Sequence, residues 1–259
     1  MALWRRAVET HIPDELLFRT LWDIAVTEKK IGDRQLVIVG HSMGGLVGRY
    51  VLDNGEPGAP HYDEKTYGAI VRATSHLVTI ATPHTGSPMA DIAFDPKNAG
   101  TLGKVANDMG LGFAKNLTTK RLGVPAFAAQ MGDAFRKRPV VTIATTSYSH
   151  MPEVDLGTRD MDQSLMMLGR VLEAQGFGEN DGVVTATSGS GLFGQCGGGC
   201  VQGTPIPGAL QAWFRVDLNH TQARLDVMEG DIVLVKGGRA TAKLGAYIGA
   251  HLFDPVTGK

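Results

Sequence analysis

The sequence has few cysteines, no long apolar run and no surplus of charge of either sign. Its 259 residues carry 25 Lys and Arg against 26 Asp and Glu, for a net charge of −1. The longest basic cluster, residues 136–138, has three residues. A nucleic-acid-binding protein needs a basic surplus or a basic stripe. We therefore expect no nucleic-acid partner.

Signals for a membrane are equally scarce. No segment approaches the roughly 18 apolar residues of a membrane-spanning helix. Residues 1–14 contain two arginines but lack the apolar core of an export signal. We expect no stable membrane span and, by default, a cytoplasmic location, with transient contact at a lipid interface left open.

The two cysteines, Cys196 and Cys200, stand in a glycine-rich run. This spacing suits a short disulfide in an oxidising compartment or two free thiols. A metal site is less favoured because no second pair of Cys or His residues lies beside them.

The composition is that of a folded protein rich in glycine. Hydrophobic residues make up 43% and charged residues 20%, which excludes wholesale disorder. Glycine supplies 34 of 259 residues, nearly twice its usual share of about 7%. At about 100 to 200 residues per domain the length admits one large or two small domains, and we expect a single domain over residues 1–259.

Helical and strand patterns alternate along the chain. Residues 36–39 form an uninterrupted aliphatic run, the pattern of a strand buried on both faces. The expected strands cover residues 36–39, 76–81 and 140–145, and the expected helices residues 14–30, 46–52 and 163–175. This alternation predicts an α/β fold with a parallel sheet covered by helices. Residues 88–138, where glycines interrupt apolar clusters, form either a cap or lid over the sheet or ordinary connecting helices.

Residues 40–45 read Gly-His-Ser-Met-Gly-Gly and directly follow the first expected strand. A serine at a sharp strand-to-helix turn has strained backbone angles, and we expect Gly40 and Gly44 to let the chain pass closely. Such a turn exposes the hydroxyl of Ser42 and directs the amide of Met43 at a developing oxyanion. The bare pattern also fits a plain glycine turn. The strand before it, the helix after it and Gly45 favour a nucleophile.

A serine nucleophile needs a base, and the base needs an acid that fixes its tautomer. After a serine at such a turn, the acid and then the histidine follow in the chain. Asp181 lies in a turn before an apolar pair, and His220 follows the apolar stretch 212–216. The alternative interpretations are an Asx-turn aspartate and a surface histidine. The remaining candidates are Asp155 and Asp160 as reserve acids and His251, which we assign to the face of a helix over residues 242–253.

Four segments in this order resemble the bacterial triacylglycerol lipases and related esterases of the α/β-hydrolase superfamily. They are residues 40–45, residues 81–87 (Ala-Thr-Pro-His-Thr-Gly-Ser), residues 180–183 (Asn-Asp-Gly-Val) and the pair Asn219-His220. The resemblance implies that Ser42 is the nucleophile, Asp181 the acid and His220 the base. It makes His84 local scaffolding rather than a base.

The sequence departs from that family in two places. Only 35 residues precede Leu36, and no His-Gly dipeptide occurs, so the usual N-terminal strands and the second oxyanion donor are not recognisable. We expect either a truncated start or residues 1–13 folding back. Many of these lipases bind calcium through an aspartate two residues beyond the catalytic histidine, where this chain has Gln222. We therefore expect no metal.

The resemblance implies hydrolysis of carboxylic esters through an acyl-enzyme on Ser42, with no cofactor and with a small-molecule or lipid ester as substrate. The alternatives are an acyltransferase or thioesterase using the same residues, and a catalytically silent hydrolase-like binding module.

Overall fold

The computed structural model describes residues 36–59, 62–95, 117–122, 140–149, 159–191, 211–223, 232–234 and 240–242. The expected helix over residues 14–30 and most of residues 88–138 lie outside this part of the chain. So do Asp155, Cys196, Cys200 and His251. The expected absence of N-terminal strands and the cap or lid therefore stay predictions.

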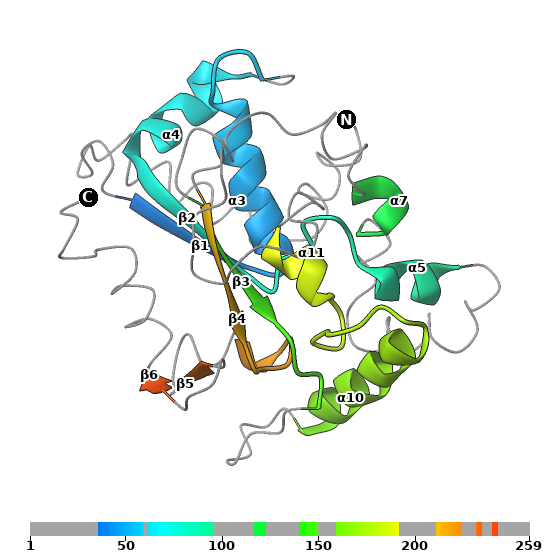
Figure 1. The fold of residues 1–259 in the computed structure, drawn as a ribbon. Coiled ribbons are helices and arrows are strands. Elements are labelled where there is room, and N and C mark those ends of the chain that lie inside the picture. The colour runs from blue at the N-terminus through cyan, green and yellow to red at the C-terminus, as the bar shows by residue number, and fades with distance from the viewer. Residues whose placement is uncertain are drawn as a thin grey trace.

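The described strands form one sheet in the order β1-β2-β3-β4-β5-β6 (Figure 1). The first four strands run parallel, and the last two are antiparallel. Their bounds are Leu36–His41 (β1), Thr74–Ile80 (β2), Val140–Thr145 (β3), Gln211–Val216 (β4), Ile232–Leu234 (β5) and Ala240–Ala242 (β6). The predicted parallel, helix-covered sheet is confirmed. Ala242, which we assigned to a helix, ends β6 instead.

The helices connect and cover the parallel strands. Their bounds are Met43–Asn54 (α3), Glu64–Gly68 (the π-helix η2), Ala69–Ala73 (α4), Pro88–Phe94 (α5), Thr119–Leu122 (α7), Arg159–Ala174 (α10) and Ala186–Ser190 (α11). Helix α3 packs on β1 and β2, and α11 packs on β3 and β4 (Figure 1). The predicted helices over residues 46–52 and 163–175 both begin earlier than expected. In α10 the extra turn holds Asp160 and Asp162, acidic residues that suit a helix N-terminus.

Two of the apolar clusters in the described residues include side chains of the sheet strands. One lies between α3, α4 and strands β1 and β2, and includes Ile38, Leu52, Ile70 and Leu77. The other includes Val78, Ile80, Ile143, Val216 and Leu218. The expectation that residues 36–39 are buried on both faces is wrong at Val39, which is 47% exposed. Side chains alternate along a strand, so Val39 points away from the face on which Ile38 packs.

Candidate active site

Ser42 occupies the turn between β1 and α3. Its backbone has a φ of 53° and a ψ of −129°, outside the backbone conformations that residues other than glycine normally adopt. The Ser42 amide donates to the carbonyl of Ile80 at 2.8 Å, which fixes the turn to the end of β2. The sequence thus produces the strained strand-to-helix turn that residues 40–45 predicted.

The glycines around Ser42 are not equally constrained. A Cβ added to Gly40 would lie 2.5 Å from the backbone nitrogen of Gly45, and one added to Gly45 would lie 2.1 Å from Thr82 Oγ1. A Cβ added to Gly44 would meet nothing within 4 Å. The expected close approach exists, because a Cβ on Gly40 would also lie 2.6 Å from the backbone carbon of Gly44, but it requires a glycine at position 40 and not at position 44. The second tight position is Gly45, because α3 packs against the segment that follows β2.

His220 lies just beyond β4 and reaches both Ser42 and Asp181. Its Nε2 is 2.9 Å from Ser42 Oγ, and its Nδ1 is 2.9 Å from Asp181 Oδ2. The backbone amide of His220 also donates to the carbonyl of Asp181 at 3.1 Å. Three side chains from distant parts of the sequence are thus joined in one line of hydrogen bonds.

His41, beside the serine, also contacts His220, a contact that sequence reasoning missed. Its Nε2 lies 2.8 Å from the carbonyl oxygen of His220, and the two ring centroids are 4.9 Å apart. Because the acceptor is a carbonyl, Nε2 of His41 carries the proton. This bond ties the loop after β4 to the end of β1.

Asp181 is fully buried and accepts four hydrogen bonds. Its Oδ1 accepts from the amides of Val183 at 2.9 Å and Val184 at 2.7 Å, while its Oδ2 accepts from His220 and from the Thr145 hydroxyl. Burial raises the pKa of Asp181, but the neighbouring His220 and these donors together lower the pKa below its ordinary value of 3.8. The carboxylate is therefore ionised at neutral pH.

The turn that carries Asp181 is fixed against α10 and the end of β3. The amide of Tyr148 donates to the carbonyl of Asn180 at 3.0 Å, and the Asn180 side chain donates to the carbonyl of Gly169 in α10 at 3.3 Å. A Cβ on Gly182, whose φ is 98°, would lie 2.7 Å from the carbonyl oxygen of Leu165. Asp181 follows a helix in the chain, yet these contacts bring it to the carboxyl end of β3.

A second buried aspartate, which sequence reasoning missed, supports the loop of His220. Asp162 of α10 accepts from the Asn219 side-chain amide at 2.7 Å, and Asn219 Oδ1 accepts from the amides of Thr221 and Gln222. The reserve acid Asp160 is exposed on the first turn of α10. The two carboxylates differ because residue 162 lies on the buried face of α10 and residue 160 on its exposed face. The face of the helix, and not the position in the sequence, is the signal that distinguishes them.

Met43 is the first residue of α3, and its amide belongs to the helix N-terminus next to Ser42. The first amides of a helix have no partner within the helix and carry a partial positive charge. This position fits the oxyanion donor that the sequence predicts.

Gln222, two residues beyond His220, is buried, and its Oε1 accepts from the amide of Asn219 at 3.4 Å. In the described ranges, no group of three or more His, Cys, Asp or Glu side chains is arranged to hold a metal ion. Within the same ranges, no helix has both the length and the hydropathy to cross a bilayer.

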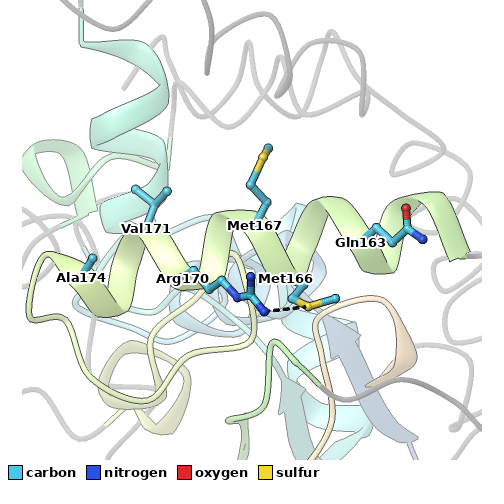
Figure 2. Close-up of a pocket in the computed structure, with 6 residues that line it drawn as sticks. All are labelled: Gln163, Met166, Met167, Arg170, Val171 and Ala174. Carbon is cyan, nitrogen blue, oxygen red and sulfur yellow. Dashed lines mark hydrogen bonds between the residues drawn. The ribbon is translucent and has the colours of Figure 1, made fainter.

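A pocket lies along α10 (Figure 2). It is lined by Gln163, Met166, Met167, Arg170, Val171 and Ala174. Arg170 Nη2 approaches the Met166 sulfur at 3.6 Å within it. None of these residues is a candidate for catalysis.

Comparison with known proteins points to one fold. Residues 15–117 match the family described as "PGAP1-like alpha/beta domain". The lipase BlEst2 of Bacillus licheniformis in its mature form aligns with a TM-score of 0.50 and 21% identity, over 80% of this chain and 66% of that protein. Its propeptide form aligns with a TM-score of 0.51 and 20% identity, over 80% of this chain and 36% of that one. No curated protein matches the sequence significantly.

The aligned region thus spans slightly less than two thirds of the mature lipase. At this level of identity the likeness concerns the fold, and it agrees with the parallel sheet and the covering helices. The chain therefore has the α/β-hydrolase fold, in the form found in bacterial lipases.

Proposed function

We propose that the protein is a serine hydrolase that cleaves carboxylic esters through Ser42, His220 and Asp181. The observation that carries the proposal is the unbroken line of hydrogen bonds from Ser42 Oγ to His220 and from His220 to Asp181, each at 2.9 Å. The lipase fold supports lipid esters, or small esters with an apolar acyl group, as the substrate class.

The hydrogen bonds assign the proton positions. An ionised carboxylate can only accept hydrogen bonds, so Nδ1 of His220 carries a proton and donates a hydrogen bond to Oδ2 of Asp181. Nε2 of His220 then has a lone pair, which accepts a hydrogen bond from the Ser42 hydroxyl. The imidazole is in the tautomer that a general base requires.

The reaction follows from this arrangement. As Ser42 Oγ attacks the ester carbonyl, its proton passes to His220 Nε2, and Asp181 stabilises the imidazolium. The Met43 amide and the α3 N-terminus stabilise the oxyanion. His220 protonates the departing alcohol, and water activated by the same imidazole then releases the acid from Ser42.

Labelling and hydrolysis test this assignment directly. A fluorophosphonate probe is expected to label the wild-type chain and not Ser42→Ala. Ser42→Ala is also expected to lower the hydrolysis of p-nitrophenyl esters by at least about 10⁴-fold. Absence of labelling in the wild-type chain would instead indicate a silent module.

Product analysis separates hydrolysis from acyl transfer. With an alcohol added to the ester reaction, a hydrolase releases mainly the free acid, whereas an acyltransferase forms mainly the new ester. Comparing p-nitrophenyl esters of increasing acyl length with matching thioesters then defines the substrate class.

A further inference from the structure

Residues 82–87, here called the bridging segment, connect β2 to α5 and take no part in the proposed chemistry. The segment follows Ala81, which has a φ of 50° and is, with Ser42, one of two non-glycine residues at positive φ in the described ranges. Ala81 and Ser42 directly follow the neighbouring strands β2 and β1. Backbone strain of this kind persists only where surrounding contacts over-determine the conformation.

One end of the bridging segment is fixed to α3, the helix that follows Ser42. Thr82 packs against Gly45 so closely that a Cβ there would lie 2.1 Å from Thr82 Oγ1. The buried Arg49 of α3 lies 3.1 Å from Nδ1 of His84, and Nε2 of His84 lies 2.9 Å from the Thr79 hydroxyl. Arginine can only donate, so His84 accepts at Nδ1 and donates from Nε2.

His84 is held in this neutral tautomer by its surroundings. Burial, and then the charge of Arg49, lower the pKa of His84 well below its ordinary value. Both ring nitrogens are occupied within the scaffold, in agreement with the scaffolding role expected for His84. The imidazole thus joins α3 to β2 without serving as a base.

The other end of the bridging segment is fixed to the turn that holds the acid. The Ser87 hydroxyl donates to the carbonyl of Val183, and the amide of Val183 donates to Asp181 Oδ1 at 2.9 Å. Ser188 of α11 adds a second link, since its hydroxyl donates to the carbonyl of Gly86 at 2.7 Å and accepts from the amide of Thr85 at 3.1 Å.

We propose that the bridging segment positions the triad, by fixing the Asp181 turn relative to the helix behind Ser42, with Ser87 as the positioning residue for the carboxylate. This proposal rests on the proposed function. The three reacting side chains come from separate segments, and misplacement of a reacting group by about 1 Å can cost roughly 10²-fold in rate. A buried connection at both ends limits such displacement.

The test compares Ser87→Ala with Ser87→Thr in the full chain. Fluorophosphonate titration counts the active sites, and kcat per titrated site, KM and the pH profile of kcat/KM are then measured. We expect Ser87→Ala to lower kcat per site about tenfold with KM nearly unchanged, and Ser87→Thr to restore it, because the threonine hydroxyl can replace the serine bond.

The pH profile distinguishes positioning from stability. A displaced carboxylate stabilises the imidazolium of His220 less, so the acid limb of the profile is expected to move to lower pH in Ser87→Ala. The titratable side chains of Asp181 and His41 both contact His220, and neither changes in this variant.

Two further variants separate the positioning role from the loss of a helix cap or of a buried hydroxyl. Ser87 also caps α5 by accepting from the amide of Ala90, whereas Ser188 has no role in that cap, so Ser188→Ala is expected to shift the acid limb in the same direction. Ser190→Ala removes an equally buried hydroxyl of α11 that donates to the local carbonyl of Thr187. It is expected to leave kcat per site and the acid limb unchanged.

The outcomes are distinct. If Ser87→Ala and Ser188→Ala lower only the melting temperature or the fraction of titratable sites, the segment is merely structural and the positioning proposal is wrong. If the wild-type chain is not labelled at Ser42, the proposed function fails and the positioning role fails with it.

Discussion

The apolar cluster beneath α3 and the edge where the parallel strands end are built on different principles. The cluster consists of aliphatic side chains such as Leu52, Ile70 and Leu77 that need only fill space. The region where the parallel strands end, here called the strand edge, contains buried polar groups such as Thr145, Asp181 and Asn219, each hydrogen-bonded to a specific partner. A buried polar group that loses its partner costs about 1–3 kcal/mol, whereas a volume-conserving apolar exchange usually costs less than about 1.5 kcal/mol.

In the apolar cluster, side-chain shape alone is enough to maintain the local structure, whereas at the strand edge each side chain must also keep its hydrogen bond or charge. At the strand edge, substitutions that keep the volume but remove a donor or a charge are expected to reduce activity. In the apolar cluster, comparable substitutions are expected to leave activity unchanged. The following variants test that contrast.

The largest effect is expected from Asp181→Asn, which preserves the shape of the side chain and removes its charge. The amide no longer stabilises the imidazolium or fixes the tautomer of His220, so kcat is expected to fall about 10⁴-fold. The matched control is Asp160→Asn, at an exposed carboxylate of α10, which is expected to retain wild-type kcat. Retention of kcat within tenfold in Asp181→Asn would disprove its role as the acid.

Gly45→Ala and Gly44→Ala compare neighbouring positions in α3. In Gly45→Ala the new methyl collides with Thr82, which is expected to cost about 1–3 kcal/mol of stability. Displacement of the serine turn is expected to lower kcat by roughly 10²-fold. Gly44→Ala places its methyl in open space and is expected to be neutral or to stabilise by up to about 1 kcal/mol.

Thermal unfolding and ester hydrolysis measure both glycine effects. Adding Thr82→Ala to Gly45→Ala removes the nearest colliding atoms and is expected to recover part of the loss. Equal effects of the two single glycine substitutions would contradict the assignment of Gly45 as the tight position.

Thr145→Val keeps the shape of Thr145 and removes its bond to Asp181. We expect kcat to fall about tenfold, since a charge-assisted hydrogen bond is worth about 1.5–3 kcal/mol, and Thr145→Ser to retain most of the activity. Leu77→Met, in the apolar cluster, is the control and is expected to leave kcat unchanged. The contrast between the two regions fails if Leu77→Met and Thr145→Val reduce kcat equally.

The smallest effect concerns the acid stability of the fold. Because the pKa of Asp181 lies below its ordinary value of 3.8, its ionised form stabilises the folded state above that pH, and this contribution is lost as the pH falls through the lowered pKa. Urea unfolding at pH 2–5 is expected to show a shallower loss of stability in Asp181→Asn than in the wild type. The difference is at most one proton, about 1.4 kcal/mol per pH unit. Parallel curves would contradict a lowered pKa.

Much of the fold was predictable because it depends on local pattern. The aliphatic runs at 36–39 and 140–145 are strands, and the apolar spacing at 163–175 falls in α10 except for its last residue. The boundaries were less accurate, as at α3 and α10, because the first turn of a helix is set by polar and glycine residues that carry no apolar period. Strands β5 and β6, only three residues long, offered no pattern to find.

Of the candidate site, the order of motifs indicated Ser42, Asp181 and His220, and the structure brings these three together. The order of motifs did not indicate the roles of Thr145, Asp162 or His41, although Thr145 ends a strand that was itself predicted. Hydroxyl side chains are common at strand ends. The hydroxyl of Thr145 has a role only because the fold brings the Asp181 carboxylate next to it.

The alternation of strands and helices and the strained turn at Ser42 follow from local sequence, because both arise from residues adjacent in the chain. Long-range packing makes Gly45 and not Gly44 the tight glycine, and it selects the buried donors that hold Asp181. Those features depend on contacts between segments separated by tens of residues or more, where the direction of each side chain is set by packing and not by local pattern.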